Sequence, residues 1–111
     1  MKIDLNPNED LIKESGANLQ RGAETVGGKL FLTSDRLYFN THSLNFATGP
    51  ESIALDQVAS VSLVWTKFLG IIPLFPNSMR VATKNGDHFD FVVVDRSEWK
   101  SAIEKQAKLR V

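Results

Sequence analysis

Histidine is the side chain best suited to acid–base and metal chemistry near neutral pH, and the chain has two, His42 and His88. His42 falls in a polar stretch that predicts a loop. The run from Asp87 to Asp90 contains metal-ligand residue types, but on a strand only His88 and Asp90 share a face. Two such residues without a third are typical of a solvated strand face. We therefore predict no metal site, no cofactor and no catalytic residue, and we expect that the protein is not an enzyme.

The glycine-containing run from Gly22 to Lys29 is a second candidate for chemistry, because its composition is similar to that of a phosphate-binding loop. Its lysine comes one residue late, and Leu30 stands where such a loop requires a hydroxyl. The residues that follow have the pattern of a strand, so no helix N-terminus would face a phosphate. We predict instead that Gly27 and Gly28 start a strand or allow two strands to cross closely.

Length and composition limit the classes of protein to consider. The chain has 111 residues and 42% hydrophobic residues, which predicts a single domain over residues 1–111. Thirteen basic residues balance thirteen acidic ones, so nucleic acid is not an expected partner. The absence of cysteine excludes disulfides and fits a reducing compartment. The N-terminus lacks a signal-peptide core and residues 68–76 are too short to cross a bilayer, so we expect a cytoplasmic protein that can associate peripherally with a membrane.

Two apolar-alternating runs flank the polar pair Ser34-Asp35, and this pattern predicts a β-hairpin over residues 27–39. A two-residue loop sets the register of the two strands, and a slip by one residue would expose half of the apolar side chains. The register gives three cross-strand pairs, of which the last lies on the opposite face: Leu32–Leu37, Leu30–Phe39 and Phe31–Tyr38.

The Asn85-Gly86 pair marks a second hairpin, in which the loop length decides which face belongs to the core. A two-residue loop would set Val81 against Asp90. A three-residue loop of residues 84–86, with the glycine in the left-handed region, instead pairs large apolar side chains and joins opposite charges outside. We therefore predict the longer loop and these pairs: Val81–Phe89, Met79–Phe91 and Arg80–Asp90.

The remaining elements are predicted from weaker patterns. Residues 10–20 predict an irregular first strand with a bend or bulge at Gly16, and Arg21 to Val26 a polar connection. Further along the chain we predict a loop over 41–51, a short strand over 53–55, a turn at 56–57, a strand over 58–65 and a loop over 67–78.

A helix is predicted after the seventh strand. Asp95 can cap its first turn, and Glu98 can complete a capping box. Residues at helical spacing then follow: Trp99, Ala102, Ile103 and Gln106. The predicted core contains these side chains: Leu30, Leu32, Leu37, Phe39, Ile53, Leu55, Val61, Leu63, Met79, Val81, Phe89, Phe91, Trp99 and Ile103.

Over residues 9–106 the chain resembles the GRAM domain, a pleckstrin-homology-like module. The resemblance rests on residues 27–39, on the run Asp56 to Val61, and on the second hairpin with Trp99. The resemblance implies a mainly β fold with one helix. In this fold a seven-stranded antiparallel partial barrel of two orthogonal sheets is capped by the C-terminal helix. It also implies a non-catalytic binding module.

The segment from Trp65 to Pro76 carries more large apolar side chains than a polar loop needs. Either they fold back onto the barrel as core, or they are exposed and contact a lipid membrane, a membrane-linked partner, another protein or a second copy of the chain. Because the predicted core is already sufficient, we predict that at least two of the six large side chains face solvent. The candidate contact residues are Lys67, Phe68, Leu69, Ile71, Ile72, Leu74 and Phe75.

Pleckstrin-homology-like domains that bind phosphoinositides would, by this resemblance, carry clustered basic residues around the first two strands. The chain offers three candidate headgroup contacts there: Lys13, Arg21 and Lys29. Glu14 and Glu24 lie among them, so the match is partial and a solvated face is the favoured interpretation.

Overall fold

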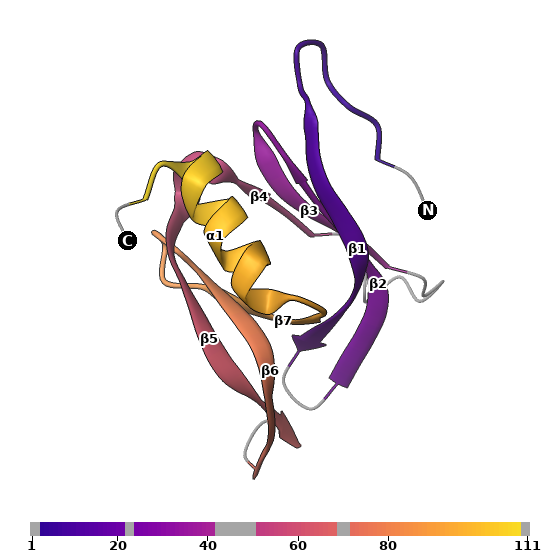
Figure 1. Ribbon diagram of the computed structural model, residues 1–111, viewed down its shortest axis with the longest axis vertical. Helices are drawn as coiled ribbons and strands as arrows, with labels where there is room; N and C mark the ends of the chain where they lie inside the picture. The colour runs from indigo at the N-terminus through magenta and orange to yellow at the C-terminus, as the bar shows by residue number, and fades with distance from the viewer. Residues whose placement is uncertain (1–2, 22–23, 42–50, 69–71, 110–111) are drawn as a thin grey trace.

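The computed structural model describes residues 3–21, 24–41, 51–68 and 72–109, with the backbone alone for residues 21, 24, 66–68 and 72–76. Its elements run along the chain as shown in Figure 1. They are β1 (Leu11–Arg21), β2 (Glu24–Thr33), β3 (Arg36–Thr41), β4 (Glu51–Ala54), the 3₁₀ turn η2 (Leu55–Gln57), β5 (Val58–Phe68), β6 (Ile72–Thr83), β7 (His88–Val93) and α1 (Arg96–Ala107).

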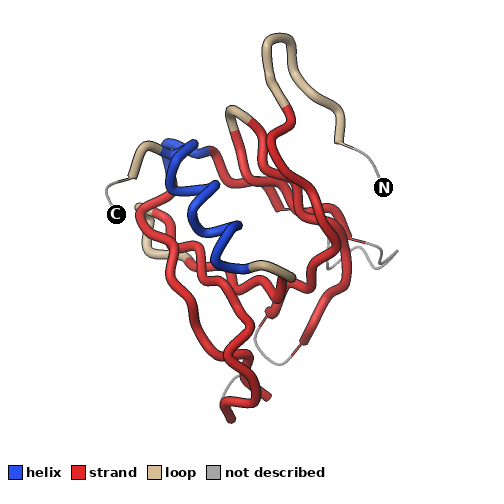
Figure 2. The backbone as a smooth tube through the Cα atoms, viewed as in Figure 1, coloured by secondary structure: helices blue, strands red, loops and turns tan. Residues whose placement is uncertain are grey.

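Within the described residues, seven strands form one antiparallel sheet in the order β4-β3-β2-β1-β7-β6-β5. The sheet curves strongly, so that its two halves cross at an angle and enclose the core, and α1 covers the open side (Figures 1 and 2). Because β4 and β5 remain the two edges, the barrel is partial rather than closed. The predicted fold class is confirmed.

The hairpin of β2 and β3 has the register that its two-residue loop predicts. Leu32 faces Leu37 and Leu30 faces Phe39, and all four side chains are buried. Phe31 and Tyr38 pair on the other face, with their ring centroids 6.2 Å apart.

The hairpin of β6 and β7 has the predicted three-residue loop. The backbone N–H of Thr83 donates to the carbonyl of Asp87 over 2.8 Å, and Gly86 has a φ of 95°. This φ lies in the left-handed region, where a side chain would be strained. The three predicted cross-strand pairs of this hairpin are all present.

The core matches the predicted set with two exceptions. Leu63 is 38% exposed, and Phe89 is partly buried against the edge of the core. Side chains that were not predicted complete the core: Ala17, Leu19, Val26, Val58 and Val93. Trp99 is fully buried and anchors α1, as predicted.

Several predicted boundaries in the first half of the chain are wrong. β1 is a long strand that runs through Gly16 without a bulge, and its register shift lies at Leu11/Lys13. β2 begins at Glu24, so both Gly27 and Gly28 lie inside a strand. A side chain at Gly28 would overlap the carbonyl oxygen of Asn40, so the glycine allows the paired strands β2 and β3 to approach closely there.

The predicted capping box is also wrong. Asp95 occupies the N-cap position of α1 but has φ 58° and ψ 45°, and its side chain makes no capping hydrogen bond. A capping side chain normally reaches the first turn from an extended backbone, and the left-handed conformation of Asp95 directs the carboxylate elsewhere. Asp95 and Glu98 are both exposed.

Candidate functional site

The hairpin of β5 and β6 extends beyond the rest of the sheet. Beyond the pair Val64–Ser78, β5 and β6 continue to pair with each other, from Thr66–Phe75 to Phe68–Ile72. In the described pairing, β6 meets β7 only between Ser78 and Ala82. The paired residues 66–68 and 72–75, here called the arm, therefore project past β7 at the lower end of Figure 1.

The arm corrects the prediction of a loop over residues 67–78. β5 continues to Phe68 and β6 resumes at Ile72, so most of the predicted loop is paired strand. The sequence was misleading because Pro73 and Pro76 interrupt ladder hydrogen bonding and are usually found in loops. The register shifts at Val64/Thr66 and Thr66/Lys67 show how the hairpin accommodates such residues.

Trp65 lies at the base of the arm and is 51% exposed. It falls in the register shift between Val64 and Thr66, where a bulge can redirect a side chain. Leu63, two residues earlier, is exposed as well. Sequence reasoning placed Trp65 in the fifth strand but did not include it among the contact residues, because a bulge leaves no short-range sequence signal.

Arg96 fixes the base of the arm to the helix. Its Nη1 donates to the carbonyl oxygens of Val64 and Ser78 at 3.0 and 3.1 Å. The first residue of α1 thus joins β5 and β6 at the last pair before the arm. The pairing of these two strands is irregular just beyond that point, and the Arg96 guanidinium supplies charge-assisted hydrogen bonds to it. The arm therefore begins from a fixed position on the sheet.

The contact residues predicted from the sequence lie mainly on the arm. Lys67 and Phe68 belong to its first strand, and Ile72, Leu74 and Phe75 belong to its second. Leu69 and Ile71 lie outside the described residues. The exposure of the arm side chains stays a prediction, since only the arm backbone is described.

The three candidate headgroup cations are not brought together in one site. The Nζ of Lys13 lies 5.3 Å from the ring centroid of Trp99, on the side of the sheet that α1 covers. Lys29 pairs with Glu14 at 3.3 Å and lies over Phe31, on the other side. The side chain of Arg21 is not described.

The described residues show no constellation for catalysis or metal binding. His88 is exposed, and Asp90 accepts hydrogen bonds from Arg80 Nε and Nη2 at 2.8 and 3.0 Å. This pairing raises the pKa of Arg80. Within the described part of the chain, no three His, Asp or Glu side chains gather as metal ligands. His42 lies outside the described residues.

The Glu9 carboxylate, whose side chain is fully buried, joins the N-terminal segment to β2 and β3. It accepts hydrogen bonds from Arg36 Nε at 2.9 Å, Thr33 Oγ1 at 2.5 Å and the Asn6 backbone N–H at 2.8 Å. The hydrogen bond from Arg36 lowers the pKa of Glu9 to about 2, and the same pair raises the pKa of Arg36. Both oxygens of the Glu9 carboxylate, and the Nε and Nη2 of Arg36, form hydrogen bonds within the fold, so the cluster serves structure rather than a ligand.

Comparison with known proteins yields a family and a fold. A family model described as the GRAM domain matches residues 1–110. The C-terminal domain of an unknown protein from Leishmania infantum has a TM-score of 0.74 at 21% identity, covering 92% of this chain and 87% of that one. No curated protein matches the chain.

Two pleckstrin-homology domains are also similar in structure. The Vps36 N-terminal PH domain has a TM-score of 0.68 at 19% identity, covering 94% of this chain and 83% of that one. The Slm1 PH domain, solved in complex with phosphoserine, has a TM-score of 0.65 at 16% identity, covering 88% and 96%. At these identities the likeness concerns the fold alone.

Proposed function

This chain belongs to the GRAM domain family, and we propose that it is a non-catalytic binding module that docks on lipid membranes through the β5–β6 arm. The family and the pleckstrin-homology-like fold support a binding module. Membrane docking rests on one observation, the projection of an apolar hairpin beyond the sheet.

The arm and its turn have a composition suited to a lipid surface. Six large apolar residues and a single cation, Lys67, lie between residues 66 and 75. Insertion of such side chains at the boundary of headgroups and acyl chains contributes roughly 0.8 kcal/mol per buried CH₂, whereas one surface lysine contributes about 1 kcal/mol. Apolar insertion therefore dominates, and attraction to anionic lipid is secondary.

Trp65 supports the same docking mode. Tryptophan is enriched where membranes meet water, because its ring is apolar and its N–H remains hydrated. Trp65 is half exposed at the base of the arm, the depth at which an inserted hairpin would meet the headgroups. The described residues contain no helix with the length and apolar character of a membrane span.

Co-sedimentation with vesicles tests this proposal. We expect the chain to bind vesicles of phosphatidylcholine alone, and to bind several-fold more tightly when phosphatidylserine is included. Trp65 emission should shift to shorter wavelength on binding, while the buried Trp99 provides a constant background.

Trp65→Ser is the informative variant, and Leu11→Ser is its matched control. Leu11 is 41% exposed at the start of β1, at the opposite end of the sheet from the arm (Figure 1). Trp65→Ser should weaken binding and Leu11→Ser should not. No sedimentation with either lipid composition would exclude membrane docking and favour a protein partner for residues 68–76. Equal effects of the two variants on vesicle binding would show that the arm is not part of the membrane contact.

A further inference from the structure

β5 is one of the two edges of the sheet, and among the described strands it pairs with β6 alone. Figure 1 shows β5 on the left, beside α1. Between the register shifts at Val58/Ser60 and Val64/Thr66 lies a regular stretch, residues 60–64, here called the free edge. In an antiparallel pair, alternate residues direct their backbone N–H and C=O groups away from the partner strand. The free edge therefore presents a row of donors and acceptors that no described strand pairs.

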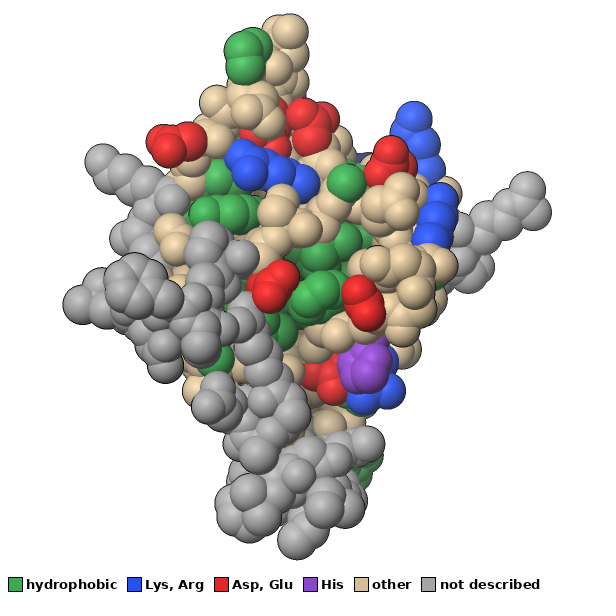
Figure 3. Space-filling model, turned by 180° about the vertical axis from the view of Figure 1, so that it is seen from behind, with side chains coloured by type: hydrophobic (Ala, Val, Ile, Leu, Met, Phe, Trp, Pro, Cys, Tyr) green, Lys and Arg blue, Asp and Glu red, His purple; other side chains and the backbone are tan. Residues whose placement is uncertain are grey.

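The free edge lacks the features that usually protect an exposed strand. Edge strands are commonly short, or they carry charged residues or proline, which discourage pairing with other chains. The opposite edge, β4, is four residues long and begins with Glu51. By contrast, residues 60–64 include no charged residue and no proline. Figure 3 shows that acidic and basic side chains are frequent elsewhere on the side of the molecule opposite α1.

Leu63 shows where an added strand would supply cover. Cross-strand partners share a face, and Val61 and Leu63 pair with Val81 and Met79 of the core. Val61 is buried, whereas Leu63 is 38% exposed although it lies on the inner side of the sheet. Because α1 packs more extensively against β5 than against any other strand, the helix forms a wall along this side. A strand added beside β5 would cover Leu63.

We propose that the free edge binds an extended peptide segment of another protein, which joins the sheet as a further strand. A row of N–H and C=O groups at strand spacing is complementary to another extended backbone. Main-chain hydrogen bonds give affinity in this mode of recognition, and alternate side chains give specificity. The edge is apolar on its inner side, and Ser60 and Ser62 are exposed on its outer side. The peptide is therefore uncharged, with apolar and small polar residues in alternation.

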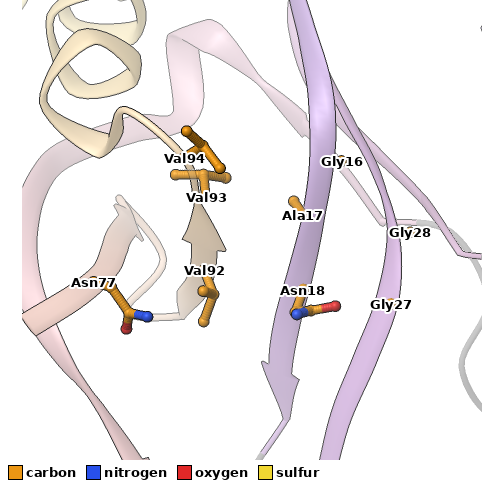
Figure 4. A pocket seen from close by; sticks show the side chains of 9 residues that line it. All are labelled: Gly16, Ala17, Asn18, Gly27, Gly28, Asn77, Val92, Val93 and Val94. Atoms are coloured by element: carbon orange, nitrogen blue, oxygen red, sulfur yellow. The ribbon is translucent and has the colours of Figure 1, made fainter. Parts of the chain in front are cut away.

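A groove of about 590 Å³ at β1 and β7 does not compete for such a peptide (Figure 4). Its lining includes Ala17 and Val93, which are cross-strand partners. β1 and β7 are interior strands that pair with each other and with β2 and β6. Their backbone groups already belong to ladders on both sides, so an added strand would have no edge to join.

An NMR titration of the isotope-labelled full chain, without lipid, tests the proposal. The probe is a short peptide of alternating threonine and valine with blocked ends. We expect saturable shifts of the amide signals of residues 60–64, with slower hydrogen exchange of the N–H groups that face the added strand. N-methylation of the valines alone, or of the threonines alone, should abolish binding in one case and spare it in the other. The reason is that one alternate set of peptide N–H groups faces β5.

Leu63→Lys should weaken binding of the peptide roughly fivefold, because it removes an apolar cross-strand contact and places a charge on the edge. Leu11→Lys is the matched control, since Leu11 is similarly exposed but belongs to the interior strand β1. It should bind the peptide like the parent chain. The N-methylated peptides leave the protein unaltered, so they test the proposal whether or not Leu63→Lys folds.

An absence of shifts in residues 60–64, or equal binding of the two N-methylated peptides, would overturn the proposal. Equal affinities of the two folded leucine variants would contradict it as well. Shifts of the same signals with protein concentration, without peptide, would overturn it in favour of a second copy at this edge. The free edge ends before the arm and the test contains no lipid, so the result is independent of membrane docking.

Discussion

At Glu9, a single buried carboxylate holds residues 4–9 against the sheet. Arg36 donates to its Oε2 and also, through Nη2, to the backbone carbonyl of Asp4 at 2.8 Å. Glu9→Gln keeps the shape but leaves the Arg36 charge unpaired. We expect it to lower the free energy of unfolding at pH 7 by roughly 1–3 kcal/mol, measured by urea denaturation.

The same pair makes stability depend on pH in the acid range. The pKa of Glu9 is lowered from 4.5 to about 2 in the folded state, so the folded protein holds this proton less tightly than the unfolded chain. The stabilisation is therefore fully present above about pH 4.5, and it is lost as pH falls toward 2. The difference between the parent chain and Glu9→Gln should shrink over that interval. A difference that is constant with pH would show that the carboxylate charge is not responsible.

At Gly86, backbone conformation alone decides how a substitution changes the stability of the protein. Because its φ is 95°, Gly86→Val should destabilise the protein by roughly 1 kcal/mol or more, measured by thermal denaturation. Gly16→Ala is the matched control, since Gly16 has open space and no positive φ. It should leave stability unchanged or slightly higher. Equal losses at both glycines would contradict the argument from backbone conformation.

Among the elements, α1 depends on one side chain for its docking. Trp99 is fully buried, and the Nζ of Lys13 lies over its ring. Trp99→Ala should cost roughly 3–5 kcal/mol of unfolding free energy, the range for a buried large aromatic, and it can unfold so small a domain. Trp65→Ala, at an exposed site, should change the same quantity by less than about 1 kcal/mol. A mild loss at Trp99 would mean that the helix contributes little to the core.

Elements fixed by short-range patterns were predictable from the sequence, and those fixed by distant contacts were not. Both tight hairpins followed from alternation and turn residues, because the loop length sets the register within a few residues. The left-handed Asp95 and the register shift at Trp65 lie next to the two ends of the Arg96–Val64 hydrogen bond, a contact between distant residues that no local pattern encodes. The arm was taken for a loop because its prolines suggested one, and the contact role of its apolar residues stays a prediction.

At the scale of the whole molecule, the core lies apart from the arm through which we propose that the protein docks. The core and α1 occupy the inner side, and the Glu9 cluster fastens the N-terminal segment to β2 and β3. The arm projects from one end of the sheet. Changes to the arm should therefore affect binding with little effect on folding.

The triple variant Ile71→Ser, Ile72→Ser and Leu74→Ser tests that separation. The arm residues pair with each other rather than with the rest of the sheet, so little of the core should depend on their side chains. We expect a nearly unchanged circular dichroism spectrum and melting temperature, together with loss of vesicle co-sedimentation. Each removed aliphatic side chain forfeits roughly 1.5–3 kcal/mol of burial in the membrane, which is enough in sum to abolish a modest affinity. A large fall in melting temperature would show instead that these side chains fold back as core, and the arm would then have no free apolar surface with which to bind.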